Sequence, residues 1–174
     1  LTENTLDLAI NGEGYFEVEL PDGETAYTRS GAFQLSENGE IVTVDGFTVL
    51  PGLTIPDGAI DVTVNSSGEV LVQLDGQVAP QNVGQFNLAN FSNEAGLLAV
   101  GDNLYLETPA SGGATTGNPD SAGFGRLQQG FLETSNVNVV EEITNLITAQ
   151  RAYEMNSKVI ETSDQMMATM SNVR

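Results

Sequence analysis

The chain has 174 residues, of which 24 are acidic and five are basic, so its formal net charge at neutral pH is −19. So few basic side chains exclude nucleic-acid binding, which needs clustered Lys and Arg, and disfavour anionic membranes for the same reason. Neither Cys nor His occurs, which excludes a disulfide framework, the usual zinc sites and a Cys- or His-based catalytic pair.

The first three quarters of the chain predict strands. Apolar residues alternate with polar ones at 16–20, 60–64 and 86–88, which is typical of strands with one buried face. Pairs in which Asp, Asn or Ser is followed by Gly separate these segments. They predict hairpin turns, because Gly reaches positive φ at little cost. The pairs are Asp22-Gly23, Asn38-Gly39, Asp45-Gly46, Ser67-Gly68 and Asp75-Gly76. We therefore predict a mainly β fold, an antiparallel β-sandwich or barrel-like domain, over residues 1–130.

The end of the chain predicts a different structure. Residues 108–125 are rich in Gly, Ser, Thr and Pro and predict a flexible surface loop or linker. Residues 131–174 contain neither Gly nor Pro, and we predict one long C-terminal α-helix there. Asn138 is its expected N-cap, with Glu141 three residues later as in a capping box. Unbroken from 138 to 172, such a helix would be about 52 Å long.

Two apolar stripes run along this helix, and two stripes need more than one packing partner. We expect these partners to be helices from a part of the protein that precedes this sequence, or from other copies. An ordinary core helix of a compact domain is the alternative. The residues predicted to make subunit contacts are Val139, Ile143, Leu146, Ile147, Gln150, Tyr153, Met155, Asn156, Val159, Ile160, Met166, Met167 and Met170.

Motifs that could indicate a ligand or catalysis are incomplete. Asn11-Gly12-Glu13-Gly14 lacks the third Gly, the Lys and the following helix of a phosphate-binding loop, so we predict a turn or bulge that leads into a strand. The Asp-Gly pairs lack the alternating ligands and closing Glu of a calcium loop. No Trp is present to stack a sugar beside a carboxylate pair. We predict no enzymatic activity, no cofactor and no metal.

Four segments resemble one protein family. Residues 134–167, TSNVNVVEEITNLITAQRAYEMNSKVIETSDQMM, closely resemble the C-terminal helix of flagellar rod and hook proteins. Residues 6–18 and 27–50 are similar to the segments that begin the β-domain of that family. VGQFNLANF from Val83 and DNLYLET from Asp102 fit the same pattern. The resemblance covers nearly the whole chain in order, and its distal rod branch is the most similar.

The resemblance implies a structural subunit of the distal rod, in the flagellar basal body, where the rod spans the periplasm. Such subunits stack helically into a tube that transmits torque and encloses the export channel. Residues 131–174 would form a rod-core helix and residues 1–130 the outer domain. Expected partners are further copies, the proximal rod and hook proteins, the surrounding ring proteins and the type III export apparatus.

Two further expectations concern the ends of the protein. No signal peptide is evident, which agrees with export through the flagellar apparatus. Because the chain begins at Leu1 rather than Met, and the N-terminal helix of the family is not in it, we expect a fragment. The alternatives are a proximal rod or hook subunit, an acidic extracellular β-module that binds glycan or matrix, and a carboxylate enzyme.

Overall fold

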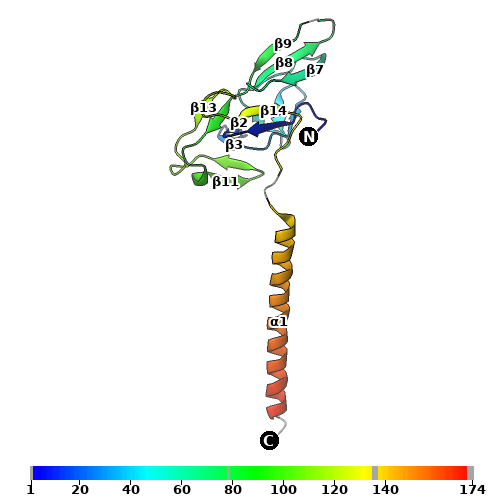
Figure 1. Cartoon of the computed structure of the whole chain (residues 1–174), viewed down its shortest axis with the longest axis vertical. Coiled ribbons are helices and arrows are strands. Elements are labelled where there is room, and N and C mark those ends of the chain that lie inside the picture. The colour runs from blue at the N-terminus through cyan, green and yellow to red at the C-terminus, as the bar shows by residue number, and fades with distance from the viewer. Residues whose placement is uncertain (1, 78, 135–136, 172–174) are drawn as a thin grey trace. The chain divides into compact units, whose positions relative to one another are not determined.

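The structure is a computed structural model of the chain and describes residues 2–77, 79–134 and 137–171. It divides into two compact units, Leu1–Glu133 and Thr134–Arg174. The sequence predicts this division three residues earlier, after residue 130. The elements of the first unit, labelled in Figure 1 where there is room, are β1 Leu8–Asn11, β2 Tyr15–Glu19, β3 Thr25–Thr28, β4 Phe33–Leu35, β5 Ile41–Thr43, β6 Thr48–Val49, β7 Ala59–Val64, β8 Glu69–Leu74, β9 Gln81–Gln85, β10 Leu88–Asn90, the 3-10 helix η1 Glu94–Gly96, β11 Leu98–Gly101, β12 Leu104–Leu106, β13 Thr115–Gly117 and β14 Arg126–Gln129.

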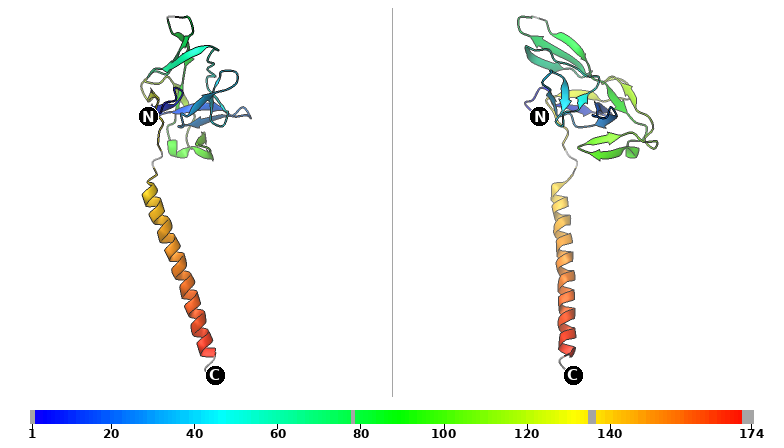
Figure 2. Two further views of the ribbon diagram at one scale, coloured as in Figure 1. Left: turned by 90° about the vertical axis from the view of Figure 1, so that its right-hand side faces the viewer. Right: turned by 180° about the vertical axis from the view of Figure 1, so that it is seen from behind.

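The described strands form three sheets, and all their pairs are antiparallel, as predicted. The largest runs in the order β11-β12-β3-β2-β6-β5-β4, with β10 beside β2 and β13 beside β10. The other two are β7-β8-β9 and β1-β14. In both views of Figure 2, as in Figure 1, β7–β9 lie at one end of this unit and β11 at the other.

The five predicted turns each join two paired strands. Their glycines, at positions 23, 39, 46, 68 and 76, all have positive φ, between 77° and 88°. The prediction succeeds because a hairpin turn depends on its own few residues, whose backbone preferences can be taken directly from the sequence.

One core joins the three sheets. Leu8 from β1, Phe16 from β2 and Val72 from β8 belong to it and are almost fully buried. The ring of Phe16 meets Phe33 edge-on, with ring centroids 4.9 Å apart, and Phe86 at 6.2 Å. A single contiguous core is what allows the short strands of this unit to fold as one body.

A second, aromatic cluster contains Tyr15, Tyr27, Phe91 and Tyr105. Tyr27 meets Phe91 edge-on, with centroids 4.7 Å apart. Burial raises the pKa of the Tyr27 hydroxyl to about 12, and the Glu107 and Glu17 carboxylates add to this rise. Burial also raises the pKa of Glu17. Both shifts follow from the cost of charging a group that is partly removed from water.

Two predictions for this unit are wrong in part. Ile60 was expected on a buried face, but its side chain is 67% exposed, because a bulge between Ala59 and Asp61 shifts the pairing of β7 with β8. Residues 108–125 were predicted to be a flexible surface loop or linker, but β13 lies there and pairs with β10. Within the same segment, Ser111 is 1% exposed and Phe124 packs against the core.

The second unit contains the helix α1, Val139–Ser171, and confirms the predicted long C-terminal helix. Asn138 caps it as predicted. Its Oδ1 accepts a hydrogen bond from the Val140 amide at 3.2 Å, and its carbonyl accepts one from the Glu142 amide at 3.1 Å. Residues 172–174, to which the prediction extended, lie outside the described residues. No helix in the described part of the chain is long and apolar enough to cross a membrane.

Candidate subunit-interaction surface

The residues predicted to make subunit contacts all lie on α1. Every described side chain from Val139 to Ala168 is exposed, including Tyr153 at 76%, Met155 at 67% and Leu146 at 63%. Met170 belongs to α1, but its side chain lies outside the described residues. So many large apolar side chains in contact with water are characteristic of a surface that binds another protein.

Nine of the residues of α1 follow a seven-residue repeat, which we call the first seam. Its members, spaced alternately by four and three residues, are Val139, Ile143, Leu146, Gln150, Tyr153, Ser157, Ile160, Asp164 and Met167. Counted every seven residues from Val139, the residues of this seam are all apolar. Counted every seven residues from Ile143, they are polar from Gln150 onward. This is the a/d pattern of a coiled coil, in which polar a positions fix register and partner number.

A second seam lies about 150° around the helix from the first, at 100° per residue. It contains Ala152, Met155, Val159 and Met166. Its methionines are flexible and polarizable, so they can adapt to a partner surface of irregular shape. Ile147 and Asn156 belong to neither seam and flank the first one on opposite sides, so the structure does not place all the predicted residues on one surface.

From residue 143 to 163, the charges of α1 lie on a narrow strip between the seams, whereas Glu141 and Glu142 lie in its first turn and Asp164 in the first seam. Arg151, Glu154, Lys158 and Glu161 are the only charged residues from 143 to 163, and we call them the charged strip. They alternate in sign at spacings of three and four residues, an arrangement that stabilises a helix from within. Over these turns neither seam carries a charge, so both can be buried without removing an ion from water.

The first unit exposes apolar residues that the sequence did not identify as contact residues. Leu98 and Val100 lie on β11, at one end of the largest sheet, and are 54% and 48% exposed. Leu35, on β4 at the other end, is 44% exposed. The alternation of apolar and polar residues cannot distinguish an exposed edge strand from a buried strand, since both can show the same pattern. The sequence feature that could have indicated the exposed residues of β11 is the lack of charged residues between Glu94 and Asp102.

The edge of β7, by contrast, is covered by a side chain. The Gln129 amide group donates a hydrogen bond to the Val62 carbonyl at 2.7 Å, and its oxygen accepts one from the Val64 amide at 3.1 Å. A glutamine therefore occupies the place that a further strand would take. Covering an edge in this way prevents unwanted strand pairing.

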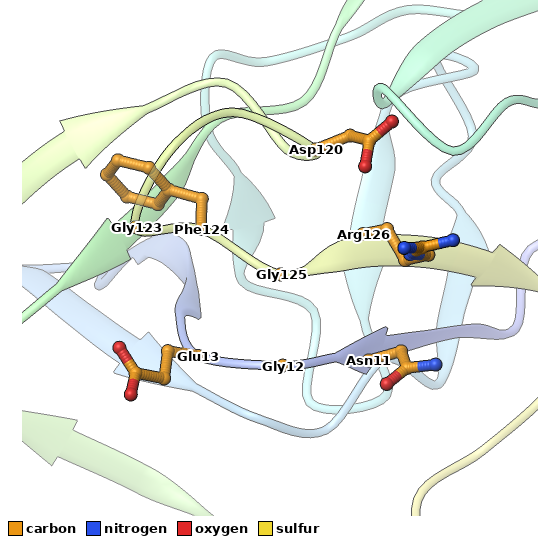
Figure 3. A pocket seen from close by; sticks show the side chains of 8 residues that line it. All are labelled: Asn11, Gly12, Glu13, Asp120, Gly123, Phe124, Gly125 and Arg126. Carbon is orange, nitrogen blue, oxygen red and sulfur yellow. The ribbon is translucent and has the colours of Figure 1, made fainter.

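The Asn11–Gly14 segment forms a turn that β2 follows, as predicted. It lines a shallow pocket of about 270 Å³ together with Arg126 from β14 and with Asp120 and Phe124 from the segment before that strand (Figure 3). The carboxylates of Glu13 and Asp120 point in different directions and do not converge. Among the described residues, no group of three or more Asp or Glu side chains could hold a metal ion.

Comparison with known proteins gives two family matches. Residues 9–72 match the family described as "Flagellar hook protein FlgE/F/G D1 domain". Residues 128–173, which include α1, match "Flagellar basal body rod FlgEFG protein C-terminal". The first match lies within the β unit, whereas the second begins in β14 at the end of that unit and extends over α1.

Individual relatives agree with these matches. "Flagellar basal-body rod protein FlgG" of Caulobacter vibrioides is 60% identical over all of this chain, which spans 66% of that relative's length. The protein of the same description from Bacillus subtilis is 43% identical over 99% of this chain and 67% of its own length. "Flagellar hook protein FlgE" of Salmonella typhimurium is 40% identical over 68% of this chain but only 29% of its own length.

Proposed function

We propose, because the chain belongs to the FlgG family of flagellar basal-body rod proteins, that it acts as a structural subunit of the distal rod. The family is structural rather than enzymatic, and its place is the basal-body rod. Within the tube, α1 would form part of the inner layer and the sheets of the first unit the outer layer. The alternative of a hook subunit is less well supported, because the hook relative matches a smaller part of the chain.

A single observation carries the mechanism, namely that α1 exposes two separate apolar seams, neither of which carries a charge from residue 143 to 163. A helix with one seam can pair once, whereas a helix with two can join a neighbour on each side. Repetition of a contact between different surfaces builds an open helical polymer rather than a closed pair. The second seam therefore supports a tube, and not only a dimer.

The energy available to such contacts can be estimated from exposure. Fully burying a Leu or Ile side chain contributes about 1.5–3 kcal/mol. Since Leu146 and Ile160 are each 63% exposed, closing a neighbour over either one would contribute about 1–2 kcal/mol. The first seam has several such positions, so its contribution is repeated along the helix in every subunit of the tube.

Assembly with other axial proteins follows from the same role. We propose that the partners are further copies of this chain at the seams and the proximal rod and hook proteins at the two ends of the distal rod. The surrounding ring proteins would contact the outer sheets, and the type III export apparatus would deliver the subunit. None of these contacts needs a cofactor.

The test is electron microscopy of a longer version of the protein, extended to the full length of its FlgG relatives. Straight tubes would support a rod subunit. Curved tubes would favour the hook alternative. A protein that stays monomeric across salt and protein concentrations, with its helices intact by circular dichroism, would contradict the proposal. It would favour the acidic glycan- or matrix-binding module, which a glycan array could then examine.

A further inference from the structure

Arg29 has an exceptional place in the first unit. It directly follows β3 and is the only basic residue before Arg126. Its Nη1 donates hydrogen bonds to the carbonyls of Gly12 and Gly14, both at 2.9 Å, and Nη2 donates one to the Ile10 carbonyl at 3.4 Å. One guanidinium group therefore binds two carbonyls of the turn between β1 and β2 and one carbonyl of β1 itself.

These bonds orient the guanidinium group. Gly12 and Gly14 have φ of 120° and 131°, a backbone conformation that aims both carbonyls at the same group. The guanidinium carbon also lies 5.9 Å from the centroid of the Tyr15 ring, within the range of a cation–π contact. A planar group with five fixed donors can satisfy all these acceptors at once, whereas the ammonium group of Lys cannot.

A further donor of Arg29 reaches the end of the unit. Its Nε binds Glu133 Oε2 at 3.1 Å, and Glu133 is the last residue of the first unit. Backbone hydrogen bonds hold the chain as far as Gly130, whose amide donates to the Asp7 carbonyl at 2.7 Å. The ion pair extends this attachment to the residue that precedes Thr134, where the second unit begins.

We propose that Arg29 is a positioning residue that fixes Glu133, and thereby the point at which the chain leaves the β unit for the helical unit. A force on the residues after 133 would then pass through the guanidinium group into β3 and the β1–β2 turn. The mechanical consequence rests on the proposed function, because only a subunit of a rotating shaft must transmit torque between its two units. The attachment of Glu133 itself does not depend on that function.

The pair is suited to positioning rather than to stabilising the fold. The side chains of Arg29 and Glu133 are 28% and 52% exposed, so water and salt screen their attraction. Losing it should release residues 131–134 without unfolding the sheets. Arg29→Ala would instead leave three carbonyls without their donor and destabilise the whole unit. Glu133→Gln is therefore the informative variant, since it removes the charge and keeps every bond to the turn.

The experiment uses the absence of native cysteine, which makes one introduced cysteine a unique labelling site. A nitroxide is attached at Thr134→Cys, and its motion is followed by electron paramagnetic resonance with and without Glu133→Gln. We expect the mobile fraction to rise roughly twofold to fivefold, as for loss of an exposed ion pair. In the unchanged chain, 1 M NaCl should reproduce this rise.

Two controls separate positioning from a general loss of structure. A label at Ser157→Cys on α1 should show the same motion in all variants, and the melting temperature of Glu133→Gln should move by less than about 4 °C. Equal motion at residue 134 with Glu or Gln at 133 would overturn the proposal. Rod assembly is scored separately on the longer protein, so a failure to form tubes would count against the proposed function and not against the attachment.

Discussion

Leu146→Asp tests the first seam directly. Leu146 is 63% exposed in the single chain, so the change should leave the folded β unit as stable as before. In the tube it would remove about 1–2 kcal/mol of apolar burial. It would also place an unpaired carboxylate in the seam, at a further cost of several kcal/mol. Since 1.4 kcal/mol changes an association constant tenfold, assembly should weaken by at least about a hundredfold.

The assay is sedimentation of the longer, assembly-competent protein, with electron microscopy of the pellet. Lys158→Gln is the matched control, because it changes the net charge by the same amount but lies on the charged strip. We expect Leu146→Asp to remain in the supernatant at concentrations where Lys158→Gln pellets as tubes. Normal tubes from Leu146→Asp would refute the seam, and equal loss in both variants would point to net charge as the cause.

The remaining predictions concern the single chain. Because the pKa of Tyr27 is raised to about 12 in the folded state, its contribution to stability is present below pH 10. About 2–3 kcal/mol should be lost as the pH rises from 10 to 12, and Tyr27→Phe should flatten the unfolding free energy over that range. Asn138→Ala should remove the cap of α1, cost about 1 kcal/mol of helix stability and lower the helical circular dichroism signal. Gly12→Ala should destabilise the first unit by more than about 2 kcal/mol in urea titrations, because its Cβ would lie 2.8 Å from the Gly125 Cα. Gly23→Ala should lower the free energy of unfolding clearly less, because nothing lies within 4 Å of a Cβ added at Gly23.

The sequence predicts the local features of this protein well. The turn at Asp22-Gly23 and the cap at Asn138 depend on a few neighbouring residues, whose preferences do not need the rest of the fold. The long helix is predicted by the lack of Gly and Pro from Phe131 onward. The family is predicted by ordered motifs along the chain, and the matches over residues 9–72 and 128–173 confirm it.

Features that depend on distant contacts could not be predicted in the same way. Ile60 fits the alternation of a buried strand, and only its pairing with β8 reveals the bulge that exposes it. Residues 115–117 look like loop but pair with β10. Arg29 lies 104 residues from Glu133 in the chain, so no local pattern could join them. The helix seams remain predictions, because burial between copies is not visible in one chain.

The distribution of charge along the chain leads to a last prediction, on salt. Eighteen acidic residues and one basic residue precede Arg126, whereas six acidic and four basic residues follow from there. The outer units of neighbouring copies would therefore repel one another, while the helices would meet through seams in which Asp164 is the one charged member. Raising the salt concentration shortens the screening length from about 10 Å at 0.1 M to 3 Å at 1 M, and it leaves apolar burial intact. We expect the critical concentration for tube formation to fall as NaCl increases, measured by light scattering. An increase would mean that ion pairs between copies, rather than apolar seams, hold the tube together.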